Sequence, residues 1–154
     1  MTKQSLKCHK AAILLGGHSS RMGGQPKFLL KDGKGQSYLK RQIKALEKAD
    51  RIYLSAADAA QLALIQNVCK DKDCYGLIDV VKDCGPLGGL YTVLQQLRDE
   101  DEWIFVTACD VPELTESMVG SLIQMSVDAY EQGYDCMVYQ DSRGRIHPLC
   151  GLYR

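Results

Sequence analysis

Four glycines lie within residues 16–24, directly after the apolar segment 11–15. Glycine lets the backbone approach a ligand closely because it has no Cβ atom. Loops of this kind point several N–H groups into one concavity, which suits an anion. Arg21 and Lys27 add two fixed positive charges to the same stretch. This combination predicts a loop that binds the phosphates of a nucleoside triphosphate.

The spacing of these glycines excludes two better-known phosphate-binding loops. A P-loop has the pattern G-x-x-x-x-G-K-[ST], which does not occur in the sequence. The dinucleotide-binding pattern G-x-G-x-x-G also fails, because His18 follows Gly16 and Gly17 at the third position. A surface loop that is merely rich in turn residues is the alternative interpretation, and the neighbouring cations argue against it.

Asp110 is the second candidate for chemistry, since it follows the most apolar segment of the chain, residues 103–108. A carboxylate buried there without a partner would be costly, but at the end of a strand it can face a ligand. Mg²⁺ takes carboxylate and phosphate oxygens and keeps several waters, so one or two carboxylates suffice for a nucleotide-bound ion. The residues alone leave two interpretations: a Mg²⁺ ligand, or an aspartate that caps the next turn.

Short apolar segments alternate with helical patterns along the chain. The expected strands are residues 11–15, 51–55, 77–81, 103–108, 136–139 and 146–153; the expected helices are 38–48, 58–68, 87–97 and 115–130, with Asp58 and Thr115 as caps. This alternation predicts an α/β fold, with a mostly parallel sheet and helices on both faces. Ligands of such sheets bind outside the carboxyl ends of the strands. The glycine stretch, Asp83 and Asp110 are therefore expected at one edge.

Composition sets limits on the class of protein. The 154 residues fit one domain, residues 1–154. The balance of 19 basic and 19 acidic residues excludes a general attraction to nucleic acid or to an anionic membrane. No apolar run is long enough for a membrane span, and the N-terminus lacks the apolar part of a secretion signal. Seven cysteines without a C-x-x-C pair argue against disulfides or zinc and favour free thiols in the cytoplasm.

Three motifs resemble those of nucleotidyltransferases that act in molybdenum-cofactor synthesis, and most of all the molybdenum cofactor guanylyltransferases. The first is L-x-G-G-x-S-x-R-M-G, which starts at Leu14 and is followed by Lys27. The second is Gly85-Pro86-Leu87-Gly88-Gly89, and the third is Cys109-Asp110-Val111-Pro112. They occur in the order that the family shows, and the resemblance covers nearly the whole chain.

The resemblance implies a three-layer, Rossmann-like nucleotidyltransferase fold that transfers GMP from GTP to molybdenum-bearing molybdopterin and releases pyrophosphate. It implies Mg²⁺ on Asp110, with Lys27 and Arg21 as catalytic cations. The implied nucleotide contacts are Leu14, Leu15, Gly16, Gly17, Lys27, Ser55, Asp83 and Asp110. Its implied partners are the two substrates, with other proteins of cofactor biosynthesis and molybdoenzyme maturation.

The resemblance leaves the contact to the guanine base open between two aspartates. Asp83 is preferred, although only Cys84 separates it from the G-P-L motif, where the family often has a longer connection. The alternative is Asp79, which lies in the expected strand 77–81 and would otherwise face outward. Similarly, His147-Pro148-Leu149 resembles a family segment near the second substrate, where Arg143 and Arg145 could meet a pterin phosphate. A turn followed by an edge strand is an equal alternative.

The sequence departs from the family at its end. The family's chain typically continues to an N-x-N-T-P-E-D-like segment, whereas the only asparagine here is Asn67. The chain is therefore expected to be a fragment, a diverged short form or part of a split protein. Two rival functions follow: a CTP-dependent cytidylyltransferase, and a non-catalytic module that binds a nucleotide or the cofactor.

Overall fold

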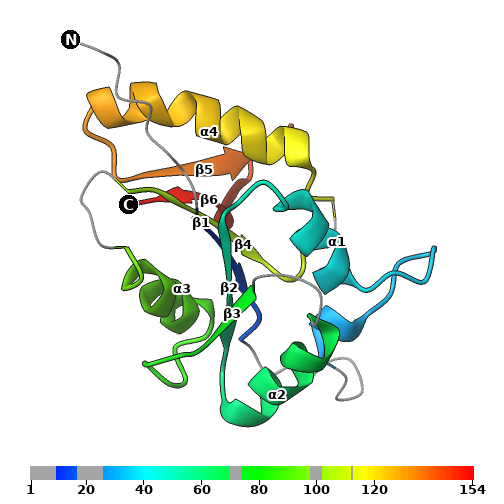
Figure 1. Cartoon of the computed structure of the whole chain (residues 1–154). Coiled ribbons are helices and arrows are strands. Elements are labelled where there is room, and N and C mark those ends of the chain that lie inside the picture. Colours follow the sequence, from blue (N-terminus) through cyan, green and yellow to red (C-terminus); the bar gives the residue numbers. More distant parts are fainter. Residues whose placement is uncertain (1–9, 17–25, 70–73, 98–101, 112) are drawn as a thin grey trace.

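The computed structural model describes residues 10–16, 26–69, 74–97, 102–111 and 113–154, and these residues form three layers (Figure 1). The described strands are β1 (Lys10–Leu14), β2 (Arg51–Ala56), β3 (Cys74–Ile78), β4 (Ile104–Ala108), β5 (Cys136–Gln140) and β6 (Ile146–Tyr153). The described helices are the short 3-10 helix η1 (Lys27–Leu29), α1 (Tyr38–Ala45), α2 (Ala59–Val68), α3 (Pro86–Leu94) and α4 (Glu116–Glu131).

The strands form one sheet in the order β3-β2-β1-β4-β6-β5. Strands β1 to β4 are parallel to one another, and β6 is antiparallel to both β4 and β5. The expected mostly parallel sheet is therefore confirmed. Because β1 to β4 run the same way, their carboxyl ends, at Leu14, Ala56, Ile78 and Ala108, lie along one edge.

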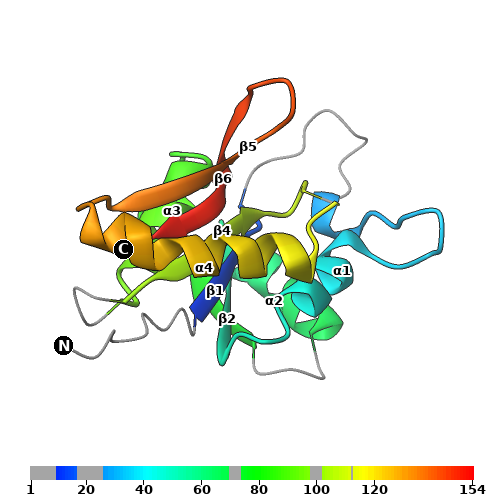
Figure 2. The ribbon, with the colours of Figure 1, turned by 90° about the horizontal axis from the view of Figure 1, so that it is seen from above.

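Helices cover both faces of this sheet, as expected (Figures 1 and 2). Side chains of a strand alternate between its two faces, so Ala11 and Ile13 of β1 join one core cluster and Ala12 and Leu14 join another. The first cluster contains buried side chains of α1, α2 and α4. The second contains Val93 of α3. All five residues of β4 are buried, which accounts for its continuous apolar sequence.

Side chains cap three of the helices. The side chain of Asp58 accepts a hydrogen bond from the backbone N–H of Gln61 at 2.8 Å, and Thr115 accepts one from Met118 at 3.3 Å. Both expected caps are therefore confirmed. Ser37 caps α1 in the same way. Each cap satisfies an N–H group that has no partner within its own helix.

Four elements end earlier than expected, and one of them is β1, which ends at Leu14 and not at residue 15. The strand expected at 77–81 is instead β3, which ends at Ile78, because Val80 donates its N–H to the Thr92 hydroxyl of α3 and so leaves the sheet. Helices α1 and α3 end at Ala45 and Leu94, since the following turns close with tighter i→i+3 hydrogen bonds. Within the described residues, no helix is both long and apolar enough to cross a membrane.

Candidate nucleotide site

A hollow of about 170 Å³ lies at the carboxyl edge of the sheet, where β1 and β4 end side by side. Residues from many parts of the chain line it: Leu14, Leu15, Gly16, Pro26, Lys27, Gln61, Pro86, Ala108, Cys109, Asp110 and Leu149. This lining unites the start of the glycine stretch with the G-P-L motif and with Asp110. The glycine stretch, Asp83 and Asp110 were expected at one edge. The described start of that stretch and Asp110 line this hollow together, and Asp83 follows β3, which ends at the same edge of the sheet.

Lys27 and Asp110 face each other in this hollow. The Lys27 Nζ atom lies 3.3 Å from Asp110 Oδ2, although the two residues are 83 positions apart in the sequence. Both side chains are about half exposed, at 44% and 56%. An exposed ion pair contributes little to stability, so either group can turn to a charged ligand at small cost.

The donors in this hollow suit a metal ion that a nucleotide brings with it. Among the described residues, no group of three or more His, Cys, Asp or Glu side chains could hold an ion by itself. Asp110 supplies one carboxylate, half exposed, at the end of β4. Mg²⁺ commonly takes one or two carboxylates and completes its shell with phosphate oxygens and water. The residues present therefore fit a nucleotide-bound Mg²⁺ and do not fit a closed structural metal site.

A second polar pair lies behind the hollow, at the ends of β2 and β3. Ser55 is fully buried and donates its hydroxyl to Asp79 Oδ1. Asp79 follows β3 directly and is only 6% exposed. The interpretation of Asp79 as an outward-facing residue of a strand is therefore wrong. Burial raises the pKa of the Asp79 carboxyl above its ordinary value, against the lowering effects of the Ser55 hydrogen bond and the Lys82 charge.

The glycines of two motifs allow this polar pair to be packed so closely. A Cβ atom at Gly16 would lie 2.8 Å from Asp79 Oδ2, and one at Gly89 would lie 2.7 Å from the Ser55 hydroxyl. Real Cβ atoms do not approach other atoms so closely. The glycines at the end of β1 and in α3 therefore give Ser55 and Asp79 the space that they occupy.

A second hollow, of about 150 Å³, adjoins Asp79. Its lining is Ala57, Asp58, Asp79, Val81, Lys82, Asp83, Cys84 and Gly85. Both candidate base contacts, Asp79 and Asp83, thus belong to the same hollow. Asp83 is exposed and has a backbone φ of +59°, a conformation that aspartate tolerates better than most residues.

Gln61, which is not among the predicted site residues, holds the end of β1 in place. Its Nε2 donates to the carbonyl oxygen of Leu15 at 2.9 Å, and its Oε1 accepts from the N–H of Ala57 at 2.7 Å. A signal was present, because Asp58 and Gln61 have the spacing of a capping box at the start of a helix. Gln42 of α1 is a second residue that was not predicted, and its side chain donates to the carbonyl oxygens of Ala108 and Val111.

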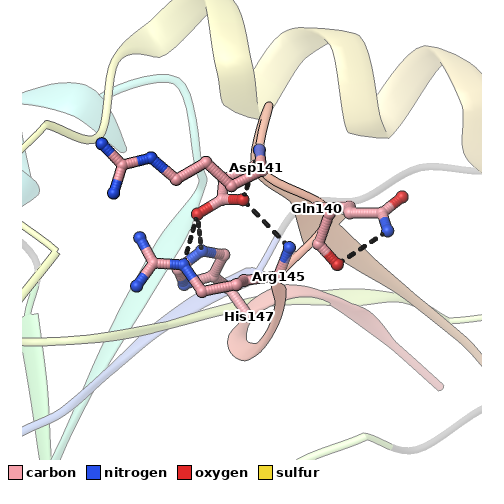
Figure 3. Close-up of polar contacts among 6 residues, drawn as sticks. Gln140, Asp141, Arg145 and His147 are labelled. Atoms are coloured by element: carbon pink, nitrogen blue, oxygen red, sulfur yellow. Dashed lines mark hydrogen bonds and ion pairs between the residues drawn. The ribbon is translucent and has the colours of Figure 1, made fainter.

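The β5–β6 hairpin extends past the rest of the sheet (Figure 2), and its turn is held by Asp141 (Figure 3). Asp141 Oδ1 accepts from the N–H groups of Arg143 and Arg145, each at 2.9 Å. Its Oδ2 accepts from Arg145 Nε at 3.0 Å and lies 3.4 Å from His147 Nε2. These contacts lower the pKa of Asp141 to about 2, and the hydrogen bond from the backbone N–H of Arg145 has the largest effect. The turn is confirmed. Strand β6 lies between β4 and β5, but its pairing with β4 covers only Cys150–Tyr153, whereas Ile146 and His147 pair with β5.

The structure places the predicted site residues in different parts of this edge of the sheet. Lys27 and Asp110 are brought together in the first hollow with Leu14, Leu15 and Gly16, whereas Ser55 is buried behind it and Asp83 lies in the second hollow. Arg21 and Gly17 lie outside the described residues.

Known structures share this fold. Molybdopterin-guanine dinucleotide biosynthesis protein A from Archaeoglobus fulgidus superposes with a TM-score of 0.70 at 19% identity, covering 94% of this chain and 66% of that chain. Rv0371c from Mycobacterium tuberculosis H37Rv gives 0.71 at 17% identity, covering 94% and 69%. Its homologue from Mycobacterium sp. strain JC1 gives 0.68 at 24% identity, with the same coverage. The chain thus spans about two thirds of the length of these proteins.

Sequence similarity identifies the family independently of these superpositions. The model of the MobA-like NTP transferase domain matches residues 11–154, which is nearly the whole chain and includes all three motifs. The chain therefore belongs to the family of MobA-like NTP transferase domains.

Proposed function

We propose that the protein transfers GMP from GTP to the molybdenum-bearing molybdopterin cofactor, forms the guanine dinucleotide cofactor and releases pyrophosphate. The observation that carries this proposal is the Lys27–Asp110 pair, which faces a hollow between the carboxyl ends of two parallel strands beside Gly16. Membership of the MobA-like family supports the reaction type. The name of the A. fulgidus protein, which concerns molybdopterin-guanine dinucleotide, supports the choice of substrates.

In this reaction the protein mainly aligns the two substrates and supplies positive charge near the phosphates. An oxygen of the pterin's terminal phosphate attacks the α-phosphorus of GTP, a new P–O bond forms, and the bond to the bridging oxygen of pyrophosphate breaks. No protein nucleophile is required, because the acceptor already carries a phosphate. Negative charge grows on the departing pyrophosphate, so a fixed cation such as Lys27 stabilises the transition state more than the bound substrate. Arg21 is proposed for the same task.

Asp110 is the residue that would hold Mg²⁺ at this site. A bound Mg²⁺ would neutralise and polarise phosphate oxygens. The structure of Rv0371c in complex with manganese supports a divalent ion in a protein of the same fold. Lys27 places a positive charge 3.3 Å from Asp110 Oδ2, on the side of the hollow where the phosphates are proposed to bind.

The base of the nucleotide is proposed to occupy the second hollow. Guanine presents two donors on one edge, N1–H and the 2-amino group, which one carboxylate can accept. Asp83 is exposed in this hollow and is the proposed acceptor. Asp79 is the alternative, although one of its oxygens already accepts the Ser55 hydroxyl.

Calorimetric titration with GTP and with CTP, each with and without Mg²⁺, tests the proposal. We expect GTP to bind in a saturable manner, more tightly with Mg²⁺, and the Mg²⁺ effect to be lost in Asp110→Asn. Glu131→Gln, which removes an exposed carboxylate at the end of α4, is the matched control and should bind like the unaltered chain. Tighter binding of CTP would favour the cytidylyltransferase. Binding without pyrophosphate release in the presence of the pterin would favour the non-catalytic module.

A further inference from the structure

Gln42 is a fully buried polar residue of α1 whose side chain reaches the turn after β4. Its Nε2 donates to the carbonyl oxygen of Ala108 at 2.6 Å and to that of Val111 at 3.2 Å. These two carbonyl groups stand on either side of Cys109 and Asp110. One amide group therefore bridges both ends of the turn that carries the Asp110 carboxylate.

The backbone hydrogen bonds of the described part of this turn are longer than usual, and the N–H of Cys109 donates to the Leu14 oxygen at 3.2 Å. The N–H of Val111 donates to the Ala108 oxygen at 3.4 Å, and the N–H of Leu114 donates to the Val111 oxygen at 3.4 Å. Backbone hydrogen bonds are usually about 2.9–3.0 Å long. The 2.6 Å bond from Gln42 is shorter than each of these bonds, so α1 contributes to the support of the turn.

Chemistry fixes the orientation of the Gln42 amide. Both of its partners are carbonyl oxygens, so only the NH₂ end can face the turn. Its Oε1 is buried and accepts no hydrogen bond from any described residue. A buried acceptor without a partner is unfavourable, so an apolar side chain of similar size would fill the same space at less cost. The amide's contribution lies in the two donors that it gives to the turn.

Helix α1 also supports the other member of the Lys27–Asp110 pair. The N–H of Tyr38 donates to the carbonyl oxygen of Leu30, just after η1, at 2.9 Å. Leu39 of α1 and Phe28 of η1 are both fully buried in the same core cluster. Because η1 begins with Lys27, one helix contacts both segments that bring the pair together.

We propose that Gln42 is a positioning residue that holds the Asp110 carboxylate in place for the metal–nucleotide. This rests on the proposed function, since it takes Asp110 as the metal ligand. Residues that orient a metal ligand typically affect metal affinity or activity by about 10–100-fold. Removal of the two donors should therefore weaken the response to Mg²⁺ through Asp110, although Gln42 itself is fully buried.

Gln42→Met tests the proposal, because methionine has a similar volume and no donor. Ser126→Ala is the matched control: Ser126 is also fully buried, and its hydroxyl donates at 2.7 Å to Ile123 within α4. The measurement is the Mg²⁺ concentration that half-saturates GTP binding. We expect a rise of about tenfold or more in Gln42→Met and no change in the control. A loss of folded protein would lower only the amount bound, so an unchanged half-saturating concentration overturns the proposal.

Amide hydrogen exchange without nucleotide or metal gives a second readout. Exchange at Cys109 and Val111 should accelerate in Gln42→Met relative to Ile13 in β1, and should not change in Ser126→Ala. Unchanged exchange at the turn overturns the proposal whether or not GTP binds. Faster exchange in a chain that binds no GTP supports the positioning of the turn and contradicts the proposed function. Gln42→Leu replaces Gln42→Met where the latter does not fold.

Discussion

At the scale of single residues, the surroundings of Asp79 change its acid–base chemistry. It is nearly buried at the end of β3, and burial raises the pKa of its carboxyl above the ordinary value of 3.8. Ser55 and Lys82 act in the opposite direction but do not cancel this effect. A raised pKa means that the folded chain disfavours the ionised form. At neutral pH, ionisation of Asp79 therefore opposes folding.

Asp79→Asn should consequently raise the unfolding temperature at pH 7. The favourable contribution of a protonated Asp79 is complete below pH 3.8 and is lost as the pH rises through the raised pKa of the folded chain. Asparagine cannot ionise and can still accept the Ser55 hydroxyl. Thermal unfolding of both chains should show a difference in unfolding temperature at pH 7 that disappears as the pH falls to 3.5. A lower unfolding temperature for the variant at pH 7 would mean that the carboxylate is stabilised by its neighbours.

Asp83→Asn tests which aspartate recognises guanine. Alanine is a poor choice here, because the φ of +59° would strain it, whereas asparagine accepts this conformation. Loss of a charged acceptor costs about 1.5–3 kcal/mol, so we expect GTP affinity to fall by about 10–100-fold. CTP affinity should change little. Parallel titrations of Asp83→Asn and Asp79→Asn identify the residue, since a selective loss in Asp79→Asn alone would assign the role to Asp79.

At the scale of elements, the close approach of α3 to the sheet depends on the paired glycines of the G-P-L-G-G motif. A Cβ atom at Gly88 would lie 2.5 Å from the carbonyl oxygen of Val81, and Gly89 lies against Ser55. A backbone oxygen cannot move aside as the end of a flexible side chain can. These glycines therefore set the distance between α3 and the segment that carries Asp79 and Asp83.

Gly88→Ala should destabilise the chain. Overpacking of this kind costs about 1–3 kcal/mol, which exceeds the gain of up to about 1 kcal/mol that alanine brings to a helix. Gly120→Ala in α4 is the matched control, because, apart from the local backbone of α4, no described residue has an atom within 4 Å of its added Cβ, and it should be neutral or stabilising. Thermal unfolding of the two variants measures the difference. Equal stability of the two would show that α3 can shift without cost.

Local sequence signals predicted the elements better than the contacts between them. The bounds of β6 and the caps Asp58 and Thr115 were predicted correctly, because these features depend on neighbours in the sequence. The end of β3 was not predicted correctly, since it is set by a hydrogen bond from the N–H of Val80 to Thr92 on another element. Such a contact depends on the packing of α3, which no local pattern encodes.

At the scale of the whole molecule, the sheet's topology determined how much of the site could be predicted. Parallel strands place their carboxyl ends at one edge, so the meeting of Lys27 and Asp110 follows from motif positions alone. The roles of Gln42 and Asp79 do not follow, because each depends on a partner more than twenty positions away. With equal numbers of acidic and basic residues, the molecule also has no general field for anions. Attraction of a triphosphate must come from the site itself.

A ligand that joins these distant segments should stabilise the whole fold. Ligand at one hundred times its Kd adds about 2.7 kcal/mol, which corresponds to about 5–10 °C for a domain of this size. The single tryptophan, Trp103, reports unfolding because it is fully buried, with the Arg154 guanidinium 5.8 Å from the centre of its ring. We expect Mg-GTP to raise the unfolding temperature, and the rise to shrink in Asp110→Asn but not in Glu131→Gln. An equal rise with CTP would contradict the preference for guanine, and no rise with either nucleotide would contradict the site.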